Sequence, residues 1–306
     1  MYSHAEGNTT YADGEASHTE GNLTNANGKA SHAEGSRTSA NGKASHAEGS
    51  GTRADADNSH AEGNTTTAYG NASHTEGYKT NASGNNSHAE GNLTTASGDD
   101  SHAEGYNTNA SSYNSHSEGY LTTAFEYSSH AEGHTTTASG YESHAEGYNT
   151  LASGSASHAE GSSTTASNYN SHSEGYNTTA SGGNSHAEGV STIASAYGAH
   201  AEGNSTIASG LYSHASGEGT IASGIGQTVV GRYNIEDNNA LFIVGNGTSE
   251  SNRSNALVVK TDGNIEGGLG YKIGDIKYSY NNVWAKDEKW LETGKSYASK
   301  EYPDLS

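Results

Sequence analysis

The stretch SHAEG at residues 3–7 decides the fold, because it returns with little change every fourteen residues as far as residue 213. A period this short and constant predicts repeats stacked one on the next, each burying only what its neighbours cover. Disordered chains lack strict positional periodicity, so the period indicates an ordered chain despite its low hydrophobicity. The pattern therefore describes a repeated architecture and not one active site.

Sixteen copies of the unit begin at positions 3 to 213, and eight of the fourteen places are nearly fixed. The second place is His in every copy, and the fourth is Glu in all but the last, which has Ser216. The fifth place is always Gly, the eighth always Thr and the tenth always Ala. The segments S-H-A-E and T-x-A-x predict two short strands, joined by corners rich in Gly, Asn and Ser that tolerate tight turns.

Side chains of a strand point alternately to its two faces. The first-place Ser, the third-place Ala, the Thr and the later Ala therefore share one face, while His, Glu and the variable places share the other. With the small face inward, we predict an all-β fold, a flat parallel β-roll that rises about 4.8 Å per fourteen-residue coil. An interior of Ala, Ser and Thr buries too little apolar surface to offset the ordering entropy, so something must cover the outer faces.

Composition excludes several classes of protein. Only 30% of the 306 residues are hydrophobic, which excludes a conventional globular core. The net charge is −21, and only five of the fourteen Lys and Arg lie in residues 1–226, so we expect no nucleic acid partner. No run approaches the roughly 20 apolar residues that span a bilayer, and no export signal precedes Ser3, so we expect no membrane insertion. Without Cys there is no disulfide framework and no thiolate metal site.

His and Glu are the only invariant residues on the outward face, and fixed outward places usually face something fixed. We expect the S-H-A-E strands of neighbouring chains to face each other, with imidazoles supplying the partners that buried carboxylates require. A paired carboxylate has a lowered pKa, so acid should weaken this assembly. The predicted interface ladder consists of His4, Glu6, His18, Glu20, His32, Glu34, His46, Glu48, His60, Glu62, His74, Glu76, His88, Glu90, His102, Glu104, His116, Glu118, His130, Glu132, His144, Glu146, His158, Glu160, His172, Glu174, His186, Glu188, His200, Glu202 and His214.

The unit S-H-A-E-G-x-x-T-x-A-x-G resembles the head repeat of trimeric autotransporter adhesins of the YadA type, usually written S-V-A-I-G-x-x-S-x-A-x-G. Such repeats also occur in phage tail fibres. The resemblance covers residues 3–226 and implies a left-handed parallel β-roll in a homotrimer, a number that the period alone does not give. His stands where the family usually has Val, and Glu where it has Ile, so this chain has a polar seam in place of an apolar one.

Two other interpretations of the ladder stay open. His and Glu would also suit a solvated face, although solvation does not explain their invariance. They are, in addition, good ligands for zinc or nickel. Metal sites normally occur in small numbers with tailored geometry, so we expect no metal and no cofactor. Catalytic sites are singular, and identical repeated pairs therefore predict no catalytic residues and no enzyme.

Tyrosine gathers at the two corners of the coil. Aromatic columns bind glycans or protein surfaces, but they also stack on adjacent coils and shield strand ends. The candidates for surface binding are Tyr78, Tyr106, Tyr120, Tyr148 and Tyr176 at one corner, and Tyr113, Tyr127, Tyr141, Tyr169 and Tyr197 at the other. The outward place between the fixed Thr and Ala is Thr in several coils, which raises ice binding, but Asn, Arg, Leu and Ile interrupt that array.

The repeat pattern weakens after Gly224. The segment QTVVG at 227–231 occupies the position of a seventeenth copy. The runs NALFIVGNG and SNALVVKTDGNI predict a β-hairpin. We therefore divide the chain into a β-roll over 1–226, a hairpin neck or trimerisation segment over 227–268 that caps the open roll, and a C-terminal cap or tail over 269–306. A brief amphipathic helix is expected at 285–300. Residues 240–264 resemble a module found near the ends of phage and prophage tail proteins.

These features predict a trimeric structural fibre that binds a receptor. We expect a phage or prophage tail fibre, located in the virion tail, whose partner is a glycan or protein of the host cell surface. The alternative is the head of a bacterial cell-surface adhesin. The absence of an export signal and anchor, together with the tail-like C-terminal segment, favours the virion. A glycan-degrading enzyme of the tailspike type and an ice-binding protein are less favoured.

Overall fold

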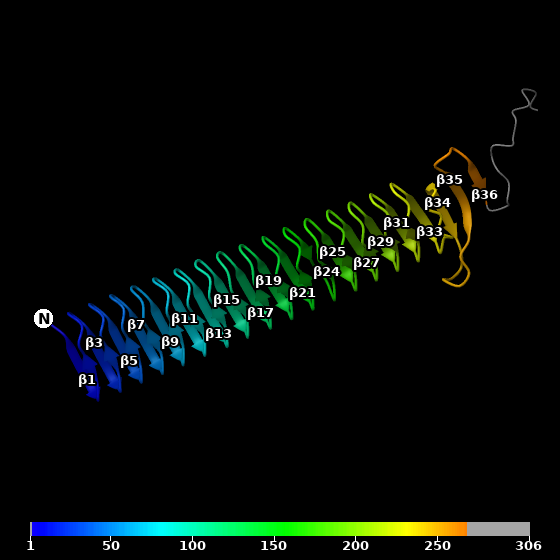
Figure 1. Cartoon of the computed structure of the whole chain (residues 1–306). Helices are drawn as coiled ribbons and strands as arrows, with labels where there is room; N and C mark the ends of the chain where they lie inside the picture. The colour runs from blue at the N-terminus through cyan, green and yellow to red at the C-terminus, as the bar shows by residue number, and fades with distance from the viewer. Residues whose placement is uncertain (1, 268–306) are drawn as a thin grey trace, which may run out of the picture.

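The computed structural model describes residues 2–267, which form an elongated parallel β-solenoid of fourteen-residue coils (Figure 1). The predicted all-β fold and its coil length are confirmed. The coils follow one another along a single axis from the N-terminus to a small group of strands at the far end (Figure 1). The expected C-terminal segment 269–306 and the helix expected at 285–300 lie outside the described residues.

Each coil contributes one long and one short strand. The long strands are β1 (His4–Asn8), β3 (His18–Asn22), β5 (His32–Ser36), β7 (His46–Ser50), β9 (His60–Asn64), β11 (His74–Tyr78), β13 (His88–Asn92), β15 (His102–Tyr106), β17 (His116–Tyr120), β19 (His130–His134), β21 (His144–Tyr148), β23 (His158–Ala159), β25 (His172–Tyr176), β27 (His186–Val190), β29 (His200–Asn204), β31 (His214–Glu218) and β33 (Thr228–Arg232). The short strands are β2 (Tyr11–Ala12), β4 (Asn25–Ala26), β6 (Ser39–Ala40), β8 (Arg53–Ala54), β10 (Thr67–Ala68), β12 (Asn81–Ala82), β14 (Thr95–Ala96), β16 (Asn109–Ala110), β18 (Thr123–Ala124), β20 (Thr137–Ala138), β22 (Leu151–Ala152), β24 (Thr165–Ala166), β26 (Thr179–Ala180), β28 (Ile193–Ala194), β30 (Ile207–Ala208) and β32 (Ile221–Ala222). Three further strands, β34 (Ala240–Asn246), β35 (Asn255–Lys260) and β36 (Ile265–Gly267), complete the described chain.

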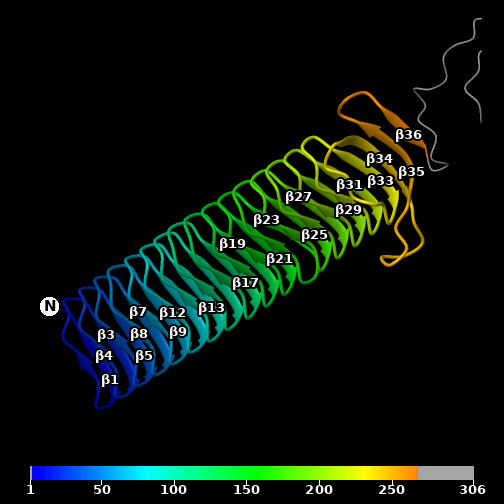
Figure 2. The ribbon, with the colours of Figure 1, turned by 45° about the vertical axis from the view of Figure 1, so that its right-hand side comes forward.

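The long and short strands form two separate sheets, one on each side of the roll (Figure 2). All pairs within the coils are parallel, and each residue pairs with the residue fourteen positions later, as His4 does with His18 and Tyr11 with Asn25. This register places every copy of a given place in one column along the roll. The repeat therefore converts each fixed position of the sequence into a continuous line of identical side chains.

The interior holds only small side chains through the regular coils. Ala33 and Ala40 of one coil are fully buried between the two sheets, and the same places are buried in nearly every coil. The first-place Ser and eighth-place Thr are buried as well, as with Ser45 and Thr52. The Ser45 hydroxyl donates to the carbonyl of Gly42 at 2.7 Å. The same bond, as from Ser31 and Ser73, stabilises the turn before other long strands. The predicted inward face of Ser, Ala, Thr and Ala is confirmed.

The corners depend on left-handed backbone conformations. Gly63 has φ +106°, and a Cβ there would overlap the carbonyl oxygen of Gly77, which explains the invariant fifth-place Gly. Non-glycine residues at the seventh and fourteenth places also adopt positive φ, including Leu93 at +60° and Ala72 at +54°. These corners therefore impose a conformation that L-residues adopt only at a cost.

The parallel ladder continues beyond residue 226. Strand β33 pairs with β31, and β34 pairs with β33 in the same parallel register, so that Thr228 and Phe242 extend the histidine column. Inward-facing Val229 and Ile243 are fully buried and larger than the Ala that they replace. Strand β35 then pairs antiparallel with β34, which confirms the predicted hairpin, and β36 adds a third strand.

Two side-chain amides close the sheet of short strands at its C-terminal end. Asn234 stands at the eighth place of the coil after β32, and its Oδ1 accepts from the backbone N–H of Ile221 at 2.7 Å. In the preceding coil the N–H of Ile207 donates to the backbone carbonyl of Thr220 instead. Gln227 Oε1 accepts in the same way from the N–H groups of Ser223 and Gly224 at 2.9 and 3.1 Å. The two amides thus replace a missing strand and satisfy an otherwise open edge.

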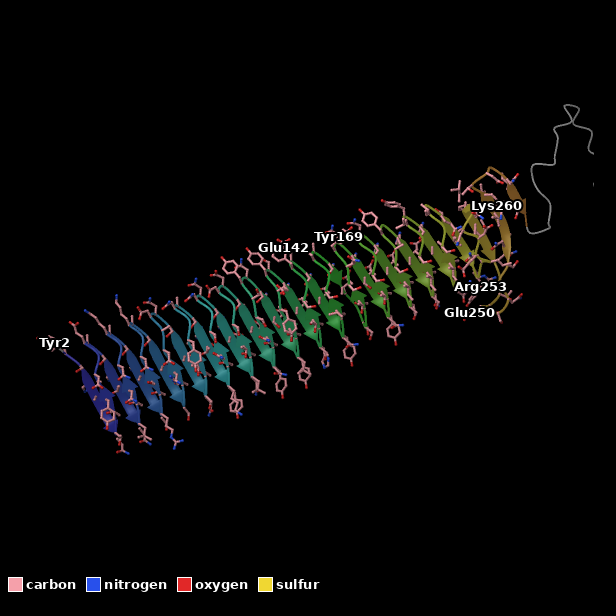
Figure 3. All side chains as sticks on the ribbon, viewed as in Figure 1. Tyr2, Glu142, Tyr169, Glu250, Arg253 and Lys260 are labelled. Atoms are coloured by element: carbon pink, nitrogen blue, oxygen red, sulfur yellow. The ribbon has the colours of Figure 1, made fainter. Side chains whose placement is uncertain are left out.

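Basic side chains join the terminal strands to the roll (Figure 3). Arg253 Nη1 donates to the carbonyls of Gly219 and Asn234 at 2.8 and 3.2 Å. Lys260 forms an ion pair with Asp237. The hairpin is therefore held by polar contacts with the last coils as well as by its sheet pairing.

Candidate functional site: the histidine and glutamate ladder

The sheet of long strands carries the predicted ladder on its outer face. The long strands β1 to β31 each begin with the second-place His of the repeat, the fourth-place Glu follows two residues later in all but β31, and the parallel register aligns both columns along the roll. The imidazoles form one unbroken stack from His4 to His214, with ring centroids 4.7–5.0 Å apart. The interplanar angle between neighbouring rings ranges from 25° for His4 and His18 to 1° for His158 and His172. The structure thus brings all the predicted ladder residues onto a single face.

Most of the ladder Glu side chains lie within 4 Å of an imidazole, either in their own coil or in the next. In the N-terminal half the nearer His is in the same coil, and His46 Nε2 lies 3.4 Å from Glu48. In the C-terminal half it is in the following coil, and His200 Nε2 lies 3.2 Å from Glu188. The change occurs at Glu132, which lies 3.8 Å from His130 and 3.9 Å from His144.

Most ladder imidazoles keep a buried nitrogen without a hydrogen-bond partner in the described chain. The Nε2 atoms concerned belong to His32, His46, His60, His74, His88, His102, His116, His130, His144, His158 and His214. The carboxylates nearest to these nitrogens lie too far away or lack the alignment that a hydrogen bond requires, whereas His172, His186 and His200 bond to Glu at 3.2–3.3 Å. A buried polar atom without a partner costs free energy, so this face has unused bonding capacity.

The ladder environment favours neutral imidazoles. Burial first, and an adjacent imidazole second, lower the pKa of His46 and His116. The same two causes lower the pKa of His32, His60, His74, His88, His130, His158 and His186. The neighbouring carboxylates oppose this shift without reversing it. Among the carboxylates, a hydrogen bond from Ser216 holds the pKa of Glu202 below its usual value.

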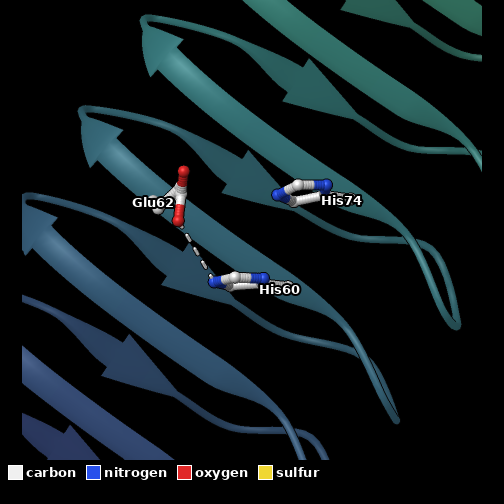
Figure 4. A group of neighbouring side chains, drawn as sticks. All are labelled: His60, Glu62 and His74. Carbon is white, nitrogen blue, oxygen red and sulfur yellow. Dashed lines mark ion pairs between the residues drawn. The ribbon is translucent and has the colours of Figure 1, made fainter.

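Several sets of three ladder side chains bring possible metal-ligating atoms together. In the described residues these sets are His60, Glu62 and His74; His158, Glu160 and His172; His172, Glu174 and His186; His186, Glu188 and His200; and Glu132, His144 and Glu146. Within each set the ligand atoms lie within 4.8 Å of one another. Figure 4 shows the first set, in which Glu62 approaches His60 while His74 lies one coil further along.

The predicted Tyr columns lie at the two edges of the roll, where aromatic rings project from the corners (Figure 3). Tyr106 stacks on Tyr120 at 5.0 Å, Tyr120 on His134 at 4.7 Å, and His134 on Tyr148 at 5.0 Å. The ring faces inside this column are covered by their neighbours, so mainly edges and hydroxyls meet solvent. His134 was not predicted as part of this column, although its place in the period is the Tyr place.

The second edge carries a less regular column. Tyr113, Tyr127 and Tyr141 stack at 5.3 and 5.1 Å, whereas Tyr169 and Tyr197 are tilted by 50°. The Thr column of the short strands is interrupted, since Thr67 pairs with Asn81 and Asn81 with Thr95. This alternation leaves no continuous Thr array of the kind that ice binding requires.

No protein-family model matches the chain, and a search of curated proteins returns no match. Among residues 2–267, none forms a helix of the length and apolar character needed to cross a bilayer.

Proposed function

We propose that this chain is the rod of a homotrimeric fibre whose subunits associate through the histidine and glutamate ladder and whose corners contact a cell surface. The observation that carries the proposal is the ladder face itself. It is the outward face with invariant side chains, and its imidazoles hold buried Nε2 atoms without partners. Neighbouring subunits would supply the missing hydrogen bonds and cover the half-buried rings.

The thin interior supports association. Through the regular coils the buried side chains are Ala, Ser and Thr, while larger buried residues such as Val229 and Ile243 occur only near the C-terminal end. At about 25 cal/mol per Å², such an interior contributes little against an ordering cost of roughly 1–2 kcal/mol per residue. Burial of the ladder faces between chains adds the surface that a single roll lacks.

The resemblance to YadA-type head repeats supports three subunits, a left-handed roll and a role in attachment. The hairpin of β34 and β35 lies in the segment that resembles phage tail modules, which favours a phage or prophage tail fibre in the virion. Its partner would be a glycan or protein of the host surface. The head of a bacterial adhesin is the second candidate, because the repeat is shared with that family. Neither role assigns a catalytic step, since each His and Glu pair repeats in the same setting.

The oligomeric state tests the assembly. Sedimentation equilibrium is expected to give three times the chain mass of 31.4 kDa. The double substitution Glu90→Lys and Glu104→Lys places cations on the ladder face and should yield monomers. Glu126→Lys with Glu142→Lys makes the same change of charge at exposed corner positions and should leave the trimer intact. A monomeric wild-type chain, or a trimeric ladder variant, would contradict the proposal.

Surface attachment requires a separate test. Replacing Tyr106, Tyr120 and Tyr148 by Ser removes the stacked column, and we expect loss of binding on a glycan array or on host cells without loss of the trimer. Replacing Tyr2, Tyr11 and Tyr69, which lie outside that column, is the matched control. Equal binding by both variants would assign the column a purely structural role.

A further inference from the structure

The three side chains His60, Glu62 and His74 converge on one point of the ladder face (Figure 4). His60 Nε2 lies 3.6 Å from Glu62 Oε2, and the three side chains each bring one possible ligand atom within 4.8 Å of the other two. His60 and Glu62 come from strand β9, while His74 comes from the adjacent strand β11. Backbone pairing of His60 with His74 fixes their separation.

The two imidazole nitrogens of this set have no other partner. Nε2 of His60 and Nε2 of His74 are both buried, and neither makes a hydrogen bond in the described chain. Glu62 lies beside them with its side chain 36% exposed, so the set is open to solvent on one side. The ladder columns contain no Lys or Arg that would compete for the carboxylate. Two unpaired nitrogens and one carboxylate oxygen are therefore available to a common ligand.

We propose that His60, Glu62 and His74 bind a divalent ion of the zinc class, and that two further sets do the same once their imidazole–carboxylate hydrogen bonds open, namely His158, Glu160 and His172, and His186, Glu188 and His200. Two imidazole nitrogens and one carboxylate oxygen form a ligand set that zinc accepts, with a fourth position left for water. Hard cations such as magnesium prefer oxygen ligands and are not expected to bind here.

Binding requires a local closure of the set. Metal–nitrogen and metal–oxygen bonds of about 2.0–2.2 Å place tetrahedral ligand atoms roughly 3.4 Å apart. The Glu62 oxygen already lies at 3.6 Å from His60 Nε2. The two imidazoles are parallel to within 11°, so both rings turn out of the stack to direct their lone pairs at one ion. Burial lowers the pKa of His60 and His74, so protons compete weakly for these nitrogens near neutral pH.

Neighbouring sets compete with each other. The set of His172, Glu174 and His186 shares His172 with one neighbouring set and His186 with the other. An ion bound to this middle set therefore prevents ions from binding to the two sets beside it. The proposed three sets share no residue and can be filled together. All ligands of a set belong to one chain, so zinc can bind whether or not chains associate, and at a filled set zinc takes the place of the hydrogen bond that a neighbouring subunit would supply.

Zinc binding to the full-length chain tests the proposal. The protein is dialysed to equilibrium against zinc, and the bound metal is counted by mass spectrometry for wild type, for the double variant His60→Asn and His74→Asn, and for His134→Asn. His134 lies in the aromatic column outside the ladder and is the matched control. We expect the double variant to bind one ion fewer per chain than wild type, and the control to bind the same number as wild type.

Three results would overturn the assignment: no zinc bound by wild type, an unchanged number in the double variant, or a loss of more than one ion, which would place zinc on the ladder as a whole. Should the double variant fail to fold by circular dichroism, Glu62→Gln keeps the shape of the side chain. It should weaken one site by roughly tenfold or more, since even outer-shell changes typically cost that much. Unchanged zinc affinity in Glu62→Gln would equally exclude this set.

Discussion

Ser117 and Thr122 face each other across the interior of one coil, with their hydroxyl oxygens 2.8 Å apart. Ser117 replaces the third-place Ala of other coils, and it remains fully buried. The interior therefore accepts one additional oxygen where a Thr hydroxyl can pair with it. Thr19 and Thr75 are fully buried at the same place in their coils, so a side chain of Thr size also fits, but the regular coils bury nothing larger there.

Ala103 tests this limit on interior size. Ala103→Leu should lower the free energy of unfolding by about 1–3 kcal/mol, because Ala103 is fully buried and the two sheets have no space for three further carbons. Ala103→Ser is the matched control, since Thr108 occupies the place that Thr122 has beside Ser117. Urea unfolding of both variants measures the difference. Equal stability of Ala103→Leu and wild type would contradict the close approach of the two sheets.

Leu93 offers a stabilising substitution. Its φ of +60° is costly for a Leu, whereas Asn107 occupies the same place in the next coil with φ +51°. Leu93→Asn should therefore raise the free energy of unfolding by up to about 1 kcal/mol, because Asn tolerates the left-handed conformation better. Leu151→Asn changes an exposed Leu on a strand and should give no such gain. A lower melting temperature for Leu93→Asn would argue against this corner conformation.

The ladder predicts acid sensitivity in the metal-free protein. Burial and the adjacent imidazoles lower the pKa of His32, His116 and His130 in the folded state. The nearby carboxylates, such as Glu34 beside His32, raise it by less. The unfolded chain therefore binds protons first as pH falls below about 6.5, and stability that is complete above that pH declines progressively below it.

Melting temperatures measured with a chelator at several pH values between 7.5 and 5 check this dependence. Replacing the three histidines by Asn, which does not titrate, should make the decline shallower. A melting temperature that rises on acidification would give the opposite sign and would contradict the lowered pKa values. Glu202 acts in the same direction at still lower pH, because the hydrogen bond from Ser216 lowers its pKa and the stability that it contributes is lost as this carboxylate is protonated.

Gln227 is predicted to be a strong stability determinant at the C-terminal end. It is fully buried, and its amide also donates to the carbonyls of Asp237 and Ala240 at 2.7 and 2.8 Å. Gln227→Leu leaves these backbone groups without partners and should cost at least about 2 kcal/mol. Asn204→Leu is the control, because Asn204 is exposed and Val190 fills the same place one coil earlier. Hydrogen exchange should show the loss beginning in β32 and not at the N-terminus.

The period of the sequence predicts the register, the two sheets and the identity of the inward face, because each of these follows from alternation along a strand repeated at constant spacing. It also places every ladder residue on one face. It does not predict which histidine each Glu approaches, since Glu132 lies almost midway between His130 and His144 and a small side-chain rotation decides the partner. The number of subunits likewise does not follow from the period.

Two substitutions in the repeat near the C-terminal end have a structural role that the sequence analysis did not predict. Gln227 stands where the coil normally has Ser, and Asn234 where it has Thr, so both amides occupy fixed places of the repeat. Their role becomes evident only from the hydrogen bonds to Ile221 and Ser223, because an amide can imitate a backbone strand only when no strand follows. Departures from a strict repeat thus mark the positions where the architecture changes.

Two features together let the length of the rod change: its regular coils are interchangeable, and the two amides close only its C-terminal end. Because each regular coil joins its neighbours through the same backbone bonds, excising one whole coil, such as residues 87–100, brings together two surfaces that already match. The molecule would shorten by one step of the histidine stack, 4.8 to 4.9 Å, while its sealed terminus stayed unchanged. Gain or loss of fourteen codons is therefore a simple evolutionary route to rods that differ in length by whole coils.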